Sequence, residues 1–382
     1  MYQERKAMTR VKCLAAALSV LLAMNPGTAA YADSTPDSAE FNIGQNNENI
    51  VHGSPEATEE EDTIAEATVN ATAGSSESTT VESHETTEPE TAETGELNEP
   101  HENKNNFPAT YNDSQTESVG NVFTISGGSI DDGDYSYDAN SNTLTILKST
   151  PITIQRVNNQ FVNAKIFIKS GVDANITLDN LLIKPTDGAA ISMGDSSANV
   201  TITIKGGTSN YLNGVNAAGI EKLSKNGRLT ITCEHADEEN HQCDINCGML
   251  DARCSKGHGA GIGASGTNGA QTGGIYIKGG MILAAGTDGA GIGGSNLADV
   301  SDINISGGII EAQGNNGAAG IGSATNGSVD SINISGGIIS AYGSEFRNSS
   351  GVRYYGAAIG AAYCSRFSSI NISGGTIYAT TA

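Results

Sequence analysis

The sequence predicts an all-β protein, a right-handed parallel β-helix of about seven or more rungs preceded by a disordered acidic segment. Three short motifs recur in fixed order between residues 119 and 382: an apolar-x-apolar triplet such as Ile-Asn-Ile, a Gly-Gly pair followed by apolar residues, and a segment resembling Gly-Ala-Gly-Ile-Gly. Successive triplets begin 26, 27, 46, 28, 29 and 38 residues apart. A period near 28 that holds three short strands is typical of a solenoid in which each rung contributes one strand to each of three sheets.

The alternation within each strand predicts which side chains face the core. In a triplet such as 275–277 the two outer isoleucines face inward and the middle residue faces solvent. The Gly-Gly pairs permit positive φ at the corners between sheets. The small Gly and Ala residues of the third motif allow close stacking. A two-sheet sandwich is the competing architecture, but a sandwich does not require the same sequence at the same spacing.

Residues 1–32 predict an export signal. Basic residues up to Lys12 precede a short apolar run over 14–24, and Ala30-Tyr31-Ala32 fits a small-x-small cleavage pattern. The apolar run is about half the length of a membrane-spanning helix, which needs about 20 residues. We therefore expect a secreted, extracellular protein, free or associated with a cell surface, with no transmembrane segment.

Residues 33–118 predict a disordered linker rich in Thr, Glu and Ser. They hold 21 acidic residues and one basic residue, Lys104. So few large apolar side chains cannot offset the chain entropy lost on folding. The net charge of the whole chain is −23, which argues against a nucleic-acid partner.

The start of the repeat domain, 119–382, predicts a cap. Tyr135, Tyr137, Leu144 and Ile146 alternate with polar residues around a turn at 138–142. This pattern predicts a β-hairpin that closes the first rung, because an exposed strand edge would promote aggregation.

The 46-residue step holds a cysteine-rich insertion at about 233–254. It carries the disulfide candidates Cys233, Cys243, Cys247 and Cys254. Clustered cysteines in a secreted chain predict disulfides, with Cys233 and Cys247 at the base of a projecting loop. Free thiols and a zinc site are the alternatives, and the spacing lacks the Cys-x2-Cys pairs of structural zinc sites. Cys364 is left over as a single thiol, and the sequence does not identify a metal.

No set of residues in the repeats predicts catalysis. The acidic residues from Asp131 to Asp138 lie in the expected cap, and His258 occupies the repeat position at which the next repeat has Asp288. A hydrolase or lyase would need paired carboxylates, or a calcium site with a basic residue beside it. We therefore expect no enzymatic activity.

The solvent-facing middle residues of the triplets predict a ladder along one face. The expected ladder is Thr177, Thr203, Thr230, Tyr276, Asn304, Asn333 and Asn371, and the last four are the candidate ligand-binding residues. Amide and hydroxyl groups can bond sugar hydroxyls, and Tyr can stack on a sugar ring. The alternative is that these are solvated strand residues with high β propensity.

The opening FTISGGSI at 123–130, the INISGG strands and the repeated GAGIG segments resemble the carbohydrate-binding parallel β-helix domains of secreted Gram-positive bacterial proteins. The resemblance covers about 120–382. It implies a polysaccharide or surface glycan as partner, no demonstrated hydrolase residues, and Ca²⁺ as the only cofactor to consider. The cysteine insertion and the absence of Trp depart from the family pattern.

The expected function is therefore that of a secreted or surface-displayed protein that binds carbohydrate and mediates adhesion. Two alternatives stay open from the sequence. One is a lyase or hydrolase that acts on acidic polysaccharide, and the other is a purely structural surface rod.

Overall fold

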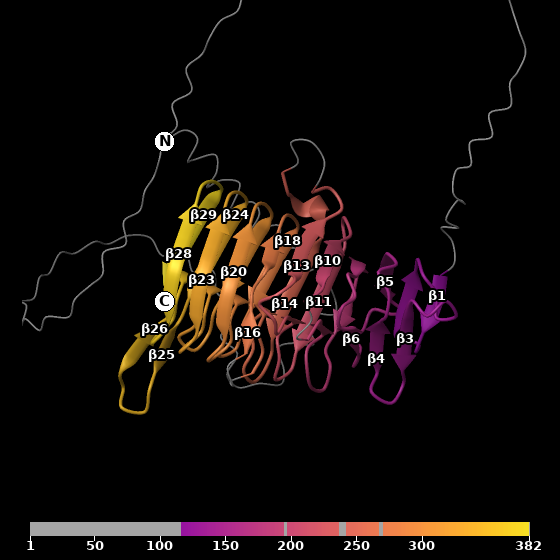
Figure 1. Cartoon of the computed structure of the whole chain (residues 1–382), viewed down its shortest axis with the longest axis horizontal. Helices are drawn as coiled ribbons and strands as arrows, with labels where there is room; N and C mark the ends of the chain where they lie inside the picture. Colours follow the sequence, from indigo (N-terminus) through magenta and orange to yellow (C-terminus); the bar gives the residue numbers. More distant parts are fainter. Residues whose placement is uncertain (1–115, 195–196, 237–241, 267–269, 382) are drawn as a thin grey trace, which may run out of the picture. The chain divides into compact units, whose positions relative to one another are not determined.

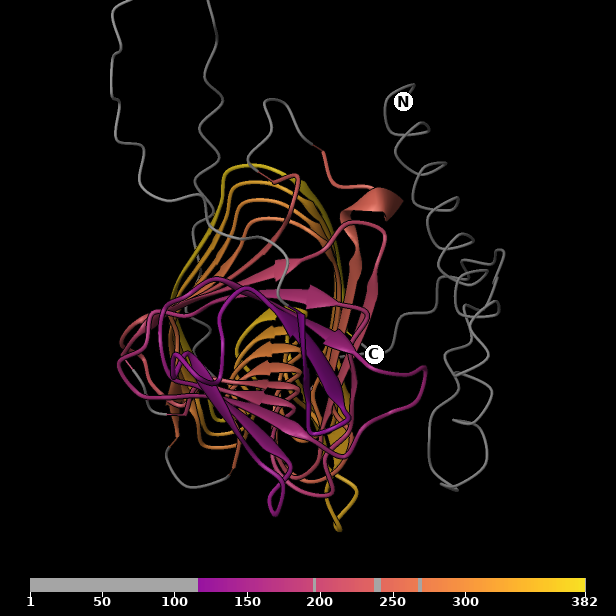
Figure 2. The ribbon, with the colours of Figure 1, turned by 90° about the vertical axis from the view of Figure 1, so that its right-hand side faces the viewer.

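The computed structural model describes residues 116–194, 197–236, 242–266 and 270–381. The predicted export signal and residues 33–115 of the predicted linker lie outside the described residues. In the described part the chain winds through three parallel sheets, which form the walls of a tube in the view along the stack (Figure 2). The predicted parallel β-helix is confirmed. No helix among the described residues is long and apolar enough to cross a membrane.

Sheet A contains the triplets. Its parallel strands follow one another in chain order along the rod (Figure 1): β5 (Ile152–Arg156), β7 (Asn175–Asp179), β10 (Asn199–Ile204), β13 (Arg228–Cys233), β17 (Ile275–Ile277), β20 (Asp299–Ile305), β23 (Ser328–Ile334) and β28 (Arg366–Ile372), with β16 (Gln271–Thr272) also paired to β20.

Sheet C contains the strands that follow the Gly-Gly corners. They are β8 (Leu182–Ile183), β11 (Ser209–Gly214), β14 (Met249–Cys254), β18 (Met281–Ala285), β21 (Ile309–Gln313), β24 (Ile338–Gly343) and β29 (Thr376–Thr381). The second glycine of each corner has positive φ, as predicted, with values of +98° at Gly280, +95° at Gly308 and +91° at Gly337.

Sheet B contains the Gly-Ala-Gly-Ile-Gly segments as two-residue strands. Its parallel members are β4 (Thr143–Ile146), β6 (Lys165–Ile168), β9 (Ile191–Ser192), β12 (Ile220–Glu221), β15 (Ile262–Gly263), β19 (Ile292–Gly293), β22 (Ile321–Gly322) and β27 (Ile359–Gly360). Seven strands in sheet C confirm the expected number of rungs.

The isoleucines of successive rungs form one continuous core. The outer residues of the first six triplets are buried, for example Ile275, Ile277, Ile303 and Ile305, each at most 1% exposed, whereas Ile372 of the last triplet is 52% exposed. Each of these four buried isoleucines sits directly beside its counterpart in the next strand. Core formation therefore depends on the repeat itself, because each isoleucine packs against the equivalent residue one rung away.

The predicted cap is confirmed. Strands β3 (Tyr135–Asp138) and β4 pair antiparallel, with Tyr135 opposite Ile146 and Tyr137 opposite Leu144. A second antiparallel pair, β1 (Thr116–Val119) and β2 (Phe123–Ser126), covers the first edge of sheet A. Strand β1 begins within the predicted linker, three residues before residue 119.

The two long steps between triplets come from insertions at different corners. The 38-residue step holds an antiparallel hairpin, β25 (Glu345–Arg347) and β26 (Arg353–Tyr355), between sheets C and B. The 46-residue step holds the cysteine loop, residues 234–248, between β13 and β14. The predicted insertion limit at Cys254 is wrong, because Met249–Cys254 is a regular strand paired with both β11 and β18.

The predicted ladder is wrong in its first members. Strand β10 pairs with β13 so that Thr201, and not Thr203, lies beside Thr230. Thr177 and Thr203 belong to the neighbouring row, which continues to Thr232. The reason is that β10 has three inward-facing residues at alternate positions. Its partner strand can therefore pair in either of two registers, two residues apart, and in both the same side chains of each strand face the core.

Candidate functional site

The four candidate binding residues form one row on the outer face of sheet A. Tyr276 lies beside Asn304, Asn304 beside Asn333, and Asn333 beside Asn371. The row continues on the other side of Tyr276 to Thr230 and Thr201. Since strands are spaced about 4.8 Å apart, six rungs carry this row over about 24 Å.

Two asparagines of this row, Asn304 and Asn333, are held in a hydrogen-bonded ladder. The side-chain Nδ2 of Asn333 donates to Oδ1 of Asn304 at 3.0 Å, and Nδ2 of Asn304 donates to Oδ2 of Asp302 at 2.8 Å. Asp302 is itself fixed, because its Oδ1 accepts from the backbone N–H of Gly274 at 2.8 Å. An amide has two donor hydrogens and two acceptor lone pairs, so this ladder leaves capacity for a ligand.

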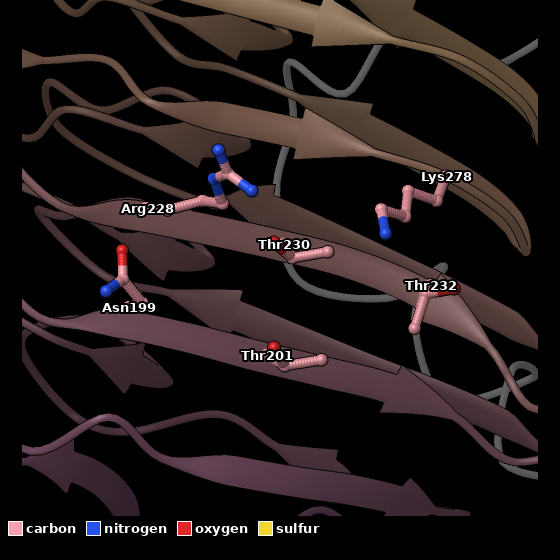
Figure 3. Close-up of a pocket in the computed structure, with 6 residues that line it drawn as sticks. All are labelled: Asn199, Thr201, Arg228, Thr230, Thr232 and Lys278. Atoms are coloured by element: carbon pink, nitrogen blue, oxygen red, sulfur yellow. The ribbon is translucent and has the colours of Figure 1, made fainter.

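A groove adjoins Tyr276 at the middle of the sheet. It has a volume of about 500 Å³ and is lined by Asn199, Thr201, Arg228, Thr230, Thr232 and Lys278. Figure 3 shows these side chains along neighbouring strands of one face, with Arg228 and Lys278 on opposite sides of Thr230. The groove and the asparagine ladder together form a continuous polar strip, which we call the sheet A strip.

The sheet A strip is cationic at the groove. The guanidinium carbon of Arg228 lies 4.1 Å from the centroid of the Tyr276 ring, a cation–π contact that orients both side chains. Arg228 and Lys278 are both exposed, and neither is paired with a carboxylate in the part of the chain that the structure describes. Sequence reasoning missed Arg228 as a site residue, although its place two residues before Thr230 puts it on the same strand face.

Two acidic residues of the cap, Asp134 and Asp138, have structural roles. Asp134 accepts from Thr150 Oγ1 at 2.7 Å and from the backbone N–H of Ser129 at 2.9 Å, and these bonds lower the pKa of its carboxyl group. Asp138 accepts from Ser141 Oγ and the backbone N–H of Asn140, which lower its pKa in the same way. Both carboxylates therefore stabilise turns.

His258 lies within hydrogen-bonding distance of its repeat counterpart. Its Nδ1 lies 2.8 Å from Oδ2 of Asp288, one rung further along the corner that leads into sheet B. Asp288 also accepts from the side chain of Asn316 in the rung after that. The pair belongs to a polar ladder at this corner, so His258 carries no arrangement that indicates a reaction.

Lys222 is fully buried beside β12. Its Nζ donates to the backbone carbonyls of Ser224 and of Asn226, the latter at 2.8 Å, and so holds the turn into β13. Burial lowers the pKa of this amine to about 8, since the ammonium form loses its hydration, while the nearby Asp302 acts in the opposite direction.

We expect Lys222 to make the free energy of unfolding rise with pH. An unfolded lysine keeps its ordinary pKa near 10.5, so between pH 8 and 10.5 the unfolded chain binds more protons than the folded chain. Urea unfolding at several pH values in that window should show this slope, and Lys222→Met should remove part of it. An identical slope in both proteins would contradict the assignment.

Three of the four insertion cysteines lie together. The sulfur atoms of Cys233, Cys243 and Cys247 all lie within 4.8 Å of one another, and Cys233 and Cys247 occupy the base of the loop as predicted. No two sulfur atoms among the described residues are at bonding distance. The predicted closure by disulfides therefore stays a prediction.

Cys254 is separate from this cluster. It ends β14, seven residues after Cys247, and its Sγ lies 3.2 Å from the backbone oxygen of Lys256. At about 3.3 Å per strand residue, the five steps from Met249 to Cys254 carry it some 17 Å along β14. Two disulfides among the four cysteines do not fit this arrangement.

Comparisons of the chain with family models, curated proteins and solved structures found no match.

Proposed function

We propose that this protein is a secreted, non-catalytic carbohydrate-binding protein that holds a linear polysaccharide along the sheet A strip. The observation that carries the proposal is the row from Thr201 through Tyr276 to Asn371, which places one polar or aromatic side chain per rung on the outer face of sheet A, with Thr230 only 8% exposed. A chain of sugar rings offers hydroxyl groups at regular intervals. A row of regularly spaced amides and hydroxyls is suited to such a ligand.

Tyr276 and the cationic groove indicate where binding is strongest and which sugars are preferred. The guanidinium of Arg228 covers one face of the Tyr276 ring, so a sugar ring would stack on the opposite face of the tyrosine. Arg228 and Lys278 favour carboxylate or sulfate groups, because a guanidinium can form paired hydrogen bonds with them. We therefore propose an acidic polysaccharide as the ligand class.

The adhesive role rests on the expected export signal and acidic linker, together with the sequence resemblance to carbohydrate-binding β-helix domains. The proposal competes with two alternative functions, a polysaccharide lyase or hydrolase and a purely structural rod.

The first test is retention on a panel of acidic and neutral polysaccharides, with measurement of released reducing ends and unsaturated uronides. Retention of an acidic polysaccharide without product supports the proposal. Product formation would establish the enzyme instead, and no retention on any glycan would leave the structural rod.

We expect Tyr276→Ala to weaken polysaccharide binding by about 5- to 150-fold, which corresponds to the loss of about 1 to 3 kcal/mol from ring stacking and desolvated contacts. Tyr342→Ala is the matched control, because Tyr342 is a half-exposed tyrosine on sheet C, away from the strip. Titration calorimetry on both variants gives the two dissociation constants. Equal loss in both would show that the strip is not the binding surface.

A further inference from the structure

We infer that Cys233, Cys243 and Cys247 form a metal site for a thiophilic divalent cation, Zn²⁺ by preference, which fastens the cysteine loop to the rod. The three residues come from the end of β13, from the loop, and from the single-turn 3-10 helix η2 (Ile245–Cys247). The inference concerns a site apart from the sheet A strip and does not depend on carbohydrate binding.

The sulfur positions match the geometry of a zinc centre. A tetrahedral Zn²⁺ with Zn–S bonds of about 2.3 Å places its sulfur ligands about 3.8 Å apart. The Sγ atoms of Cys233 and Cys243 are 3.8 Å apart, and the third sulfur lies within 4.8 Å of both. A disulfide requires about 2.05 Å and joins two sulfurs only, so it would leave one member of the cluster over.

The backbone around the cluster is arranged for thiolates. The N–H of Gly280 points at Sγ of Cys243 at 3.2 Å, and the N–H of Asp244 points at Sγ of Cys247 at 3.4 Å. Amide N–H groups directed at sulfur stabilise its anionic form and orient metal ligands. Asp244 also begins η2 as its N-cap and accepts from the N–H of Asn246 at 2.8 Å, which holds Cys247 in place.

The next rung contacts the cluster closely. A Cβ atom at Gly279 would lie 2.9 Å from Sγ of Cys233, so glycine at this corner allows the approach. Gly279 and Gly280 form the corner between β17 and β18, one rung beyond β13. A metal bound here would therefore be enclosed by the loop on one side and by the following rung on the other.

Burial makes the three sulfurs depend on a positive charge. Cys233 is 3% exposed and Cys247 is fully buried. A divalent ion at the centre of the cluster would compensate the charge of the buried thiolates, and binding would release their protons.

The described residues supply three ligands and no fourth His, Cys, Asp or Glu within the same group. Three protein ligands and one exchangeable ligand such as water make a four-coordinate zinc centre. Thiolates select zinc over Ca²⁺ and Mg²⁺, which take oxygen ligands. The site is thus distinct from any calcium site that the sequence resemblance implies.

The test is titration of the reduced full-length protein with Co²⁺, a spectroscopic probe for such sites, followed by displacement with Zn²⁺. We expect one Co²⁺ per chain, a thiolate-to-cobalt charge-transfer band, and complete loss of that band when Zn²⁺ is added. Absence of the band in correctly folded protein would overturn the inference.

Variants separate the cluster from the other cysteines. Cys243→Ser, at the least buried position of the three, should abolish the band, whereas Cys254→Ser and Cys364→Ser should keep it. Because a variant can fail to fold, circular dichroism of each is measured alongside. Protein exported to an oxidising compartment provides an independent check by non-reducing mass spectrometry. Stoichiometric zinc with three alkylatable thiols supports the site, and a Cys233–Cys247 or other disulfide within the cluster would overturn it.

Discussion

Gly322→Ala, which adds a single methyl group, is expected to lower the free energy of unfolding of the β-helix by a large amount. Gly322 lies in β22 with φ of +139°, a conformation essentially confined to glycine. A Cβ at this position would lie 1.8 Å from the backbone oxygen of Gly360 in the next rung. Backbone strain and steric overlap together should cost roughly 2 to 6 kcal/mol.

The same close approach recurs along sheet B. Hypothetical Cβ atoms at Gly263 and Gly293 lie 2.0 Å from the backbone oxygens of Gly293 and Gly322. From β15 to β22 the short third strands therefore stack backbone on backbone, and glycine is required at Gly263, Gly293 and Gly322, whereas the earlier strands carry Ser192 and Glu221 at the equivalent position. The loss of stability on substitution should appear as a lower urea midpoint in circular dichroism.

Gly171→Ala is the matched control for this prediction. Gly171 has φ of +80° but no atom within 4 Å of its hypothetical Cβ. Only the conformational cost applies there, about 1 to 2 kcal/mol. Equal destabilisation by the two substitutions would show that rung-to-rung stacking does not require glycine at position 322.

Ile332→Ala is expected to cost about 2 to 5 kcal/mol of unfolding free energy, because it removes a fully buried side chain and leaves a cavity. Ile332 lies beside Ile303 on one side and Ile370 on the other, so the cavity interrupts the core across three rungs. Hydrogen exchange should show faster opening of β20, β23 and β28 than of the capped end, since each rung depends on its neighbours.

Asp330→Ala tests whether the effect follows from burial. Asp330 lies two residues earlier in β23 and is exposed. Substitution at such a surface position typically changes stability by less than about 0.5 kcal/mol. A comparable loss at Asp330 would mean that the strand itself, and not the isoleucine core, limits stability.

The repeat made most of the fold predictable. Inward isoleucines at alternate positions, glycine corners and a period near 28 leave few arrangements that bury every isoleucine, and each predicted triplet lies in sheet A. The cap was predictable for the same reason, because Tyr135, Tyr137, Leu144 and Ile146 alternate across a turn.

The register at the start of the ladder was not predictable. Val200, Ile202 and Ile204 all face inward, so shifting the partner strand by two residues keeps every face buried. Pairing of Val200 with Leu229 places Cys233 beside Ile204, at a core position. Local alternation cannot distinguish two such registers, since both satisfy the same burial pattern.

The candidate sites, like the fold, were predictable from the sequence only in part. Sequence alone determined that Tyr276, Asn304, Asn333 and Asn371 share one face, and that Cys233 and Cys247 flank a loop, because both statements follow from strand period and repeat length. Only the tertiary structure decided that Arg228 lies against Tyr276, that Cys243 joins Cys233 and Cys247, and that Cys254 returns to the rod. Contacts between rungs and the path of a loop depend on how non-adjacent segments pack, and that packing is not encoded in any local pattern.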